Sequence, residues 1–287
     1  MSVKHVDEVS GVETTGHVWD GIRELNNPLP RWWLWTFYAT IIWAIGYMIL
    51  YPAVPLISSA TKGILGYSSR QEVAEELSAA KTAQGVYVEQ IASTPVAEIE
   101  ANPELLQFAI AGGAAAFKVN CIQCHGSGAQ GSEGYPNLND DDWVWGGSIE
   151  EIYQTITHGI RDPQDDDARY SEMSAFGDFL ESEEIRQVSA YVISLSGTPS
   201  NPEMVEPGKV IFEENCVACH GEDARGDKDF GAPNLADAIW LYGGTEADVV
   251  AQVTDPAHGM MPAWGARLGD TTVKQLAVFV HSLGGGQ

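Results

Sequence analysis

Basic residues are scarce in this chain. Its 287 residues include 15 Lys and Arg against 40 Asp and Glu, which gives a formal net charge of −25 at pH 7. Because nucleic-acid binding depends on cationic side chains that neutralise phosphates, this deficit excludes a nucleic acid as a partner on electrostatic grounds. After Tyr51 the chain carries 35 acidic and 12 basic residues. That balance predicts a basic protein partner, whose approach would be steered by charge.

Long hydrophobic runs are also few, and one of them has the length of a membrane span. The run from Trp32 to Tyr51 contains no charged residue, and it has aromatic residues near both ends. About 20 apolar residues cross the hydrocarbon layer as a helix, and aromatic rims are typical of membrane interfaces. The run starts too far along the chain and is too long for a cleaved signal peptide. We therefore expect an uncleaved anchor over residues 32–52, although a buried helix of a soluble domain is the alternative.

Cysteine is limited to four residues, and all four belong to two short motifs. Cys121-Ile-Gln-Cys124-His125 recurs as Cys216-Val-Ala-Cys219-His220. The pattern C-x-x-C-H is the attachment site of a c-type haem: the two thiols bond the haem vinyl groups, and the histidine binds the iron. A zinc site made of two C-x-x-C pairs is the alternative, but it does not explain the histidine after each pair. The motifs therefore predict two covalent haem c groups, attached at Cys121, Cys124, Cys216 and Cys219.

The two motifs belong to a longer tandem repeat. Further positions match in the same order in both copies: Gly113 and Gly208, Phe117 and Phe212, Pro136-Asn-Leu138 and Pro233-Asn-Leu235, Trp143 and Trp240, His158-Gly159 and His258-Gly259, Met173 and Met261, and Tyr191 and Phe279. Tyr191 and Phe279 stand on predicted amphipathic helices, which we expect to pack on the helices that contain Gly113 and Gly208. Glycine permits such a close approach of two helices.

Each copy resembles a class I cytochrome c along its whole length. That resemblance implies an all-α fold in which His125 and His220 are the proximal iron ligands. A neutral imidazole binds iron well, and its direction is set by the group that accepts its other N–H. In the family that acceptor is a loop proline carbonyl, which suggests Pro136 and Pro233.

The distal iron ligands implied by the resemblance are Met173 and Met261, each in a matched Met-x-Ala-aromatic-Gly setting. Most methionines merely fill gaps in a core, and Met260 is a competing neighbour of Met261. Which methionine serves which haem stays open, because tandem modules could exchange these ligands. His158 and His258 are alternative iron ligands, although solvated loop histidines are the more common case.

The N-terminal segment is similar to a more specific family. Thr15-Gly-His-Val-Trp-Asp-Gly-Ile-Arg-Glu-Leu-Asn-Asn-Pro-Leu-Pro-Arg-Trp-Trp33 precedes the expected anchor, and Gly63-Ile-Leu-Gly-Tyr-Ser68-Ser69 follows it. With one anchor and two C-x-x-C-H modules, the chain closely resembles the dihaem subunit P of cbb3-type cytochrome c oxidases, the CcoP or FixP family. One departure is Ser174, which replaces the proline that often follows the distal methionine.

The resemblance implies an electron-transfer subunit that is no enzyme on its own. It would accept electrons from a donor cytochrome c and pass them to a monohaem cytochrome subunit. They would continue to a haem–copper subunit that reduces oxygen. The alternatives are a free membrane-tethered dihaem shuttle and a dihaem peroxidase, which would need an open iron site. A single-pass protein of the bacterial inner membrane is expected, with its N-terminus in the cytoplasm and its haem domains in the periplasm.

The expected organisation is therefore one transmembrane helix followed by two tandem class I cytochrome c domains. The segments are 1–31, cytoplasmic; 32–52, the anchor in membrane lipid; 53–103, a periplasmic connector with a helix in Gln71–Ile91 and a break at 94–103; 104–197, cytochrome c domain 1; 198–207, a linker; and 208–287, cytochrome c domain 2.

Overall fold

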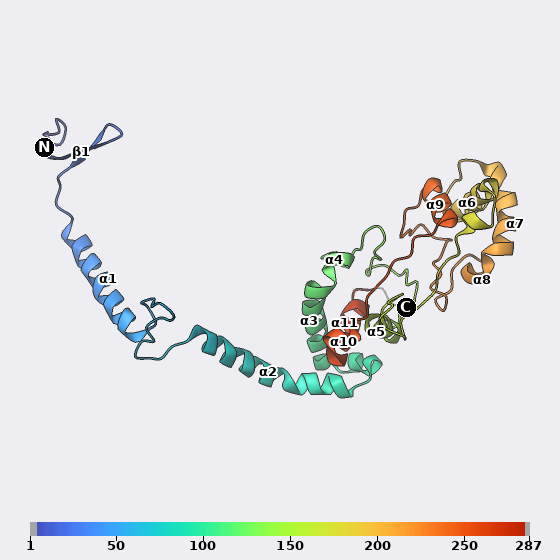
Figure 1. The fold of residues 1–287 in the computed structure, drawn as a ribbon, viewed down its shortest axis with the longest axis horizontal. Coiled ribbons are helices and arrows are strands. Elements are labelled where there is room, and N and C mark those ends of the chain that lie inside the picture. Colours follow the sequence, from blue (N-terminus) through green and yellow to red (C-terminus); the bar gives the residue numbers. More distant parts are fainter. Residues whose placement is uncertain (1–4, 285–287) are drawn as a thin grey trace. The chain divides into compact units, whose positions relative to one another are not determined.

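The computed structural model describes residues 5–284, so the ends of the predicted segments 1–31 and 208–287 lie partly outside the described residues. The chain forms two units, residues 1–82 and 83–287. Helices predominate. Their bounds are α1 Arg31–Leu50, α2 Ser69–Ser93, α3 Pro103–Asn120, α4 Ile122–His125, α5 Ile149–His158, α6 Ser182–Ser196, α7 Val205–Asn215, α8 Val217–His220, α9 Glu246–Thr254, α10 Gly265–Leu268 and α11 Asp270–His281 (Figure 1).

The first unit contains a small β-hairpin, so the expectation of an all-α chain is wrong in this segment. Strand β1 (Thr14–Trp19) pairs antiparallel with β2 (Ile22–Leu25), and Trp19 faces Ile22 in the register. Asp20 and Gly21 make the turn with positive φ angles of 51° and 85°. An Asp-Gly pair is favoured in two-residue hairpin turns, because the turn requires positive φ at both positions. That dipeptide was the sequence signal for the hairpin.

Helix α1 coincides with the expected anchor to within two residues at each end. It is long and apolar enough to cross a membrane, and none of its residues is buried within the protein. Pro30 precedes the helix, where its fixed φ is compatible with helix initiation. An exposed apolar surface of this length is stable in lipid rather than in water.

Helix α2 confirms the helix expected within residues 71–91. The predicted break after it contains a short 3-10 helix, η1 (Val96–Ala101), whose Val96 and Ile99 are buried. Two further 3-10 turns, η2 (Phe176–Asp178) and η3 (Pro202–Met204), occur later in the chain.

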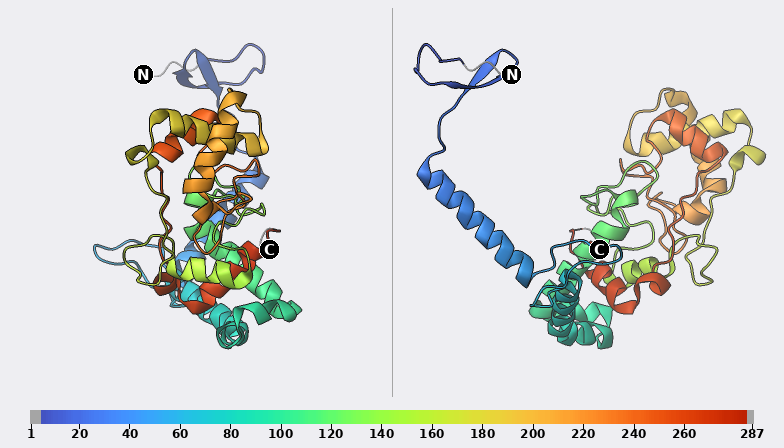
Figure 2. Two further views of the ribbon diagram at one scale, coloured as in Figure 1. Left: turned by 90° about the vertical axis from the view of Figure 1, so that its right-hand side faces the viewer. Right: turned by 60° about the vertical axis from the view of Figure 1, so that its left-hand side comes forward.

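Residues 83–284 form two helical lobes, each with its own apolar core. Lobe A consists of α3, α4, α5, α10 and α11, and lobe B consists of α6, α7, α8 and α9. In Figures 1 and 2 helix α11 lies beside α3 and α5, although it is far from both of them in the sequence. Each lobe is thus assembled from both copies of the sequence repeat.

Two close helix contacts explain this assembly. An added Cβ at Gly113 on α3 would overlap the Gln275 carbonyl oxygen of α11, and one at Gly208 on α7 would overlap the Gln187 carbonyl oxygen of α6. Phe279 packs beside Phe117, and Tyr191 packs beside Phe212, with ring centroids 5.4 and 5.2 Å apart. The expected packing of the aromatic helices on the glycine helices is confirmed, with each pair drawn from different copies.

Candidate functional site

The two C-x-x-C-H motifs have the same local structure. In lobe A the chain leaves α3 at Cys121 and continues directly into α4, so that the amide of His125 donates to the carbonyl of Cys121 over 2.9 Å. In lobe B the amide of His220 donates to the carbonyl of Cys216 over 3.0 Å. Residues three and four apart on a helical turn share one side. Each motif therefore presents two thiols and one imidazole together.

The two motif histidines are oriented by proline carbonyls. Nδ1 of His125 lies 3.1 Å from the carbonyl oxygen of Pro136, and Nδ1 of His220 lies 3.1 Å from that of Pro233. Burial lowers the pKa of both imidazoles, and the proline hydrogen bonds oppose this shift. A neutral imidazole that donates through Nδ1 keeps Nε2 as its metal-binding nitrogen.

The four cysteines are free thiols without disulfides. Burial, together with the neighbouring thiol of the same motif, raises the pKa of Cys121 and Cys216 to about 11. Both thiols are therefore protonated at neutral pH, and they lack the low pKa of a reactive thiolate.

A buried donor in lobe A fits the haem that the motifs imply. Within residues 5–284, Nε1 of Trp143 is buried and has no hydrogen-bond partner. Trp143 packs against the same apolar core as Cys121 and Ile122. A buried N–H without an acceptor is costly, and a haem carries carboxylates that could accept this bond. The residues present in lobe A therefore fit a haem group.

Each candidate distal methionine lies in the lobe that holds the other copy's motif. Met261 packs against the core of lobe A together with Cys121, and Met173 packs against the core of lobe B together with Cys216. The sequence left this pairing open. Within residues 5–284, each methionine therefore shares an apolar core with the other copy's motif rather than with its own.

Two crossing segments, residues 159–175 and 255–264, carry the methionines between the lobes. Ile160 and Met261 exchange two backbone hydrogen bonds, of 2.9 and 3.0 Å. The amide of Met173 donates to Nε2 of His258 over 3.0 Å. His258 thus accepts a hydrogen bond from the backbone of Met173, which the sequence predicts to be a distal ligand.

The lobes meet through two equivalent aromatic contacts. The ring of Trp145 covers Gly231, where an added Cβ would overlap it, and the ring of Tyr242 lies against Gly134. Each glycine stands two residues before the proline that orients a histidine. The amide of Gly134 also donates to the carbonyl of Leu241 over 2.8 Å. Sequence reasoning missed these aromatics, although both follow the matched tryptophans of the repeat by two positions.

One ion pair joins the two lobes beside these contacts. Nζ of Lys228 in lobe B lies 2.6 Å from a carboxylate oxygen of Glu151 on α5. Burial alone would raise the pKa of Glu151, but hydrogen bonds from Lys228 and Ser148 lower it to about 2. The carboxylate is therefore charged throughout the physiological range.

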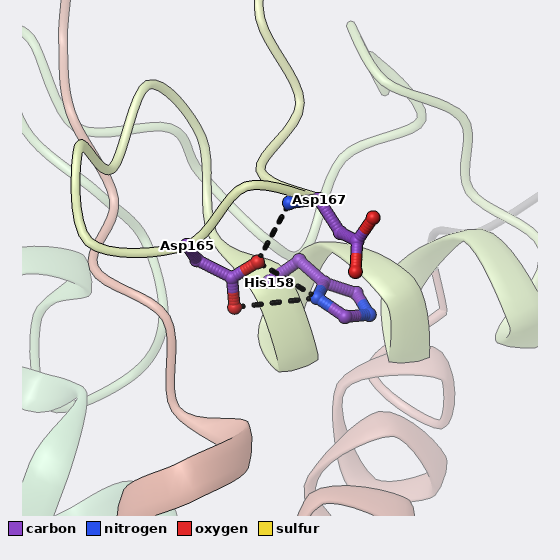
Figure 3. A group of neighbouring side chains, drawn as sticks. All are labelled: His158, Asp165 and Asp167. Carbon is purple, nitrogen blue, oxygen red and sulfur yellow. Dashed lines mark hydrogen bonds and ion pairs between the residues drawn. The ribbon is translucent and has the colours of Figure 1, made fainter.

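His158 lies in a small polar cluster with Asp165 and Asp167, drawn in Figure 3. Nδ1 of His158 lies 3.1 Å from one carboxylate oxygen of Asp165, and that oxygen also accepts the amide of Asp167 over 2.9 Å. These hydrogen bonds explain the cluster: the loop that contains Asp165 and Asp167 folds back onto the end of α5. They give His158, the last residue of α5, a partner in the loop that follows, so it is not the solvated loop histidine that the sequence predicts.

Comparisons with known proteins agree with this site. Residues 11–58 match the model of the N-terminal domain of cytochrome oxidase-cbb3, FixP, and residues 108–192 and 203–280 match the cytochrome c oxidase cbb3-type subunit III model. The chain is 66% identical over 284 residues to the cbb3-type cytochrome c oxidase subunit FixP of Rhizobium meliloti (strain 1021), covering 99% of this chain and 98% of that protein. It is 54% identical over 290 residues to subunit CcoP of Cereibacter sphaeroides, covering 100% of both chains.

The resemblance inferred from the sequence is therefore confirmed over the full chain. Because the similarity includes the N-terminal block, the helix α1 and both haem motifs, it extends beyond what cytochromes in general share. The chain belongs to the FixP/CcoP family, the membrane-anchored cytochrome c electron-transfer subunits of cbb3-type cytochrome c oxidase.

Proposed function

We propose that this chain is a two-haem electron relay, with one haem c in each lobe. The observation that carries the proposal is the repeated orientation of His125 and His220 by a proline carbonyl, at 3.1 Å in both lobes. The adjacent thiols of each motif attach the haem. Two equivalent haem motifs in one chain suit a protein that passes an electron internally.

The distal ligands are exchanged between the copies. Met261 would ligate the iron held by His125, and Met173 would ligate the iron held by His220. Support comes from the packing of each methionine on the core that contains the corresponding motif. Met260 is 61% exposed, whereas Met261 is half-buried, which favours Met261 of the two neighbours.

The protein supplies orientation, burial and potential, and the haem iron supplies the redox change. A thioether is a soft ligand that stabilises the ferrous state, so His/Met ligation raises the potential of the iron. With a histidine and a methionine side chain as its ligands, neither haem iron would be left open for oxygen. Oxygen reduction therefore belongs to another subunit.

The location and the partners of the relay follow from its membrane anchor and its negative net charge. Helix α1 holds the chain in the bacterial inner membrane, residues 1–31 face the cytoplasm, and both lobes lie in the periplasm, where c-type haem is attached. The acidic surface after Tyr51 receives a basic donor cytochrome c. The electron then passes to the monohaem cytochrome subunit and on to the haem–copper catalytic subunit.

Gentle detergent purification of the tagged chain tests the relay. We expect a haem–copper subunit and a monohaem cytochrome to accompany the chain, and the preparation to consume oxygen with a cationic cytochrome c as donor. A lone dihaem protein without oxygen uptake would instead support the free shuttle. Peroxide turnover by the isolated chain would support the peroxidase alternative.

The ligand exchange has its own test, in full-length chains that each carry one haem. In the Cys216→Ser/Cys219→Ser chain, Met261→Ala should abolish the methionine-to-ferric-iron charge-transfer absorption, and Met173→Ala should leave it in place. In the Cys121→Ser/Cys124→Ser chain the two substitutions should act in the opposite way. The reverse pattern would show that each methionine serves its own copy.

A further inference from the structure

Arg161 contacts both crossing segments through a single side chain. Its Nε donates to the carbonyl of Gly259 over 2.7 Å, and its Nη1 donates to the carbonyl of Ser171 over 2.6 Å. Gly259 stands two residues before Met261, and Ser171 stands two residues before Met173. One guanidinium is thus bonded to the backbone just ahead of both candidate distal ligands.

The backbone of Arg161 is built into the same crossing. Its amide donates to the carbonyl of Arg169 over 2.8 Å, and the preceding residue, Ile160, exchanges two hydrogen bonds with Met261. Arg161 has a φ of 52°, a left-handed conformation that costs a non-glycine residue energy. Such a conformation persists where the surrounding contacts determine it, which is the case here on both sides.

The chemistry of arginine suits a contact with two carbonyls. A guanidinium is planar and permanently charged, and it offers several N–H donors in a fixed arrangement. Hydrogen bonds from a charged donor are stronger than neutral ones. Since Arg161 is half-buried, its removal would leave two carbonyl oxygens short of a partner in a partly water-excluded place. Both methionine segments would then loosen together.

We propose that Arg161 is a positioning residue shared by the two haem sites. Its guanidinium fixes the segments that carry Met173 and Met261, and it thereby couples the distal coordination of the two irons. This inference rests on the proposed methionine ligation. It adds that a single residue, which is not itself an iron ligand, controls the distal side of both haems.

Two substitutions in the full-length chain within the purified complex test the inference. Arg161→Met removes the donors, and Arg161→Lys keeps the charge with a single donor group. Arg186→Met is the matched control, because Arg186 is exposed and forms an ion pair with Glu183 on its own helix. The readouts are the methionine-to-ferric-iron absorption, imidazole binding to the ferric protein, and the potential of each haem. Covalent haem content shows that the variants are assembled.

In Arg161→Met we expect weaker charge-transfer absorption from both haems and imidazole binding tightened on the order of 10-fold at both. Both potentials should fall, since a weakened thioether ligand and a lost positive charge each favour the oxidised iron. Arg161→Lys should give an intermediate result, and Arg186→Met should match the wild-type protein.

A change at one haem alone, or none in Arg161→Met, would overturn the inference while the methionine ligation stands. Absence of the charge-transfer absorption from the wild-type complex would overturn the ligation and this inference together. If Arg161→Met fails to assemble, Arg161→Lys decides: wild-type absorption and imidazole affinity at both haems would count against a role for the planar donor arrangement.

Discussion

Met261 and Ile160 pair through two backbone hydrogen bonds, of 2.9 and 3.0 Å, at the point where the two crossing segments meet. The pair joins the end of the first copy's helix α5 to the beginning of the second copy's methionine segment. It therefore fixes where the chain passes from lobe B back to lobe A. This crossing allows helix α11, which follows Met261, to complete lobe A.

Removal of α11 should damage the lobe that holds the first haem motif. A chain that ends at Gly269 lacks the helix that packs on α3 and α5. We expect the haem at Cys121 to bind carbon monoxide in its reduced form, because lobe A loses much of its core. The haem at Cys216 should remain closed. Spectra of truncated chains that carry one haem each would measure this, and damage confined to the second haem would contradict the exchanged assembly.

The close approach of α3 and α11 predicts a sharp difference between two adjacent glycines. An added Cβ at Gly113 would overlap the backbone oxygen of Gln275, which cannot move away. At Gly112 an added Cβ would instead meet the side-chain amide of Gln275, which is flexible. We expect Gly113→Ala to destabilise the protein by about 1–3 kcal/mol through overpacking. Gly112→Ala should be tolerated, because alanine favours a helix. Thermal unfolding of both variants compares them directly, and equal stability would argue against this packing.

The contact of Trp145 with Gly231 predicts that Gly231→Ala slows electron transfer between the haems. Gly231 has a φ of +57°, and a methyl group there would also overlap the Trp145 ring, pushing the lobes apart. Gly269→Ala is the control, since Gly269 has a φ of +77° and nothing within 4 Å of an added Cβ. Both substitutions incur the left-handed backbone penalty of about 1–2 kcal/mol. Rapid reduction kinetics should be slowed in Gly231→Ala alone, and equal kinetics would remove this contact from the relay.

The raised pKa of Asp142 predicts that the protein loses stability as the pH rises. Burial, with the charge of Asp237 as the next cause, raises the pKa of Asp142 to about 6 from its ordinary 3.8. The folded protein therefore holds this proton more tightly than the unfolded chain. The stability linked to that proton is complete below about pH 4, and it is lost as the pH rises through 6.

Asp142→Asn should therefore stabilise the protein at pH 7 by about 1 kcal/mol, after allowance for solvent screening of a half-exposed group. It should also flatten the stability profile between pH 4 and 6. Denaturant titrations at several pH values measure this, with the exposed neighbour Asp141→Asn as the control. An unchanged profile in Asp142→Asn would show that Asp142 is not the responsible group.

The anchor, the haem motifs and the repeat were all readable from the sequence, because each depends on neighbouring residues. Cys121, Cys124 and His125 lie within one turn of chain, so their joint position follows from local helical geometry. The length of α1 and the absence of charge after its first residue, Arg31, are likewise properties of a contiguous segment. The hairpin was equally local, and its Asp20-Gly21 turn signal was overlooked.

The tertiary structure alone decided which helix packs on which. Tyr191 and Phe279 occupy equivalent places on similar amphipathic helices, so local pattern could not tell whether each packs on the glycine helix of its own copy or of the other. The path of the crossing segments decided it, through contacts between residues far apart in the chain. The same path brings Met261 to lobe A and Met173 to lobe B, and it places Arg161 against both segments.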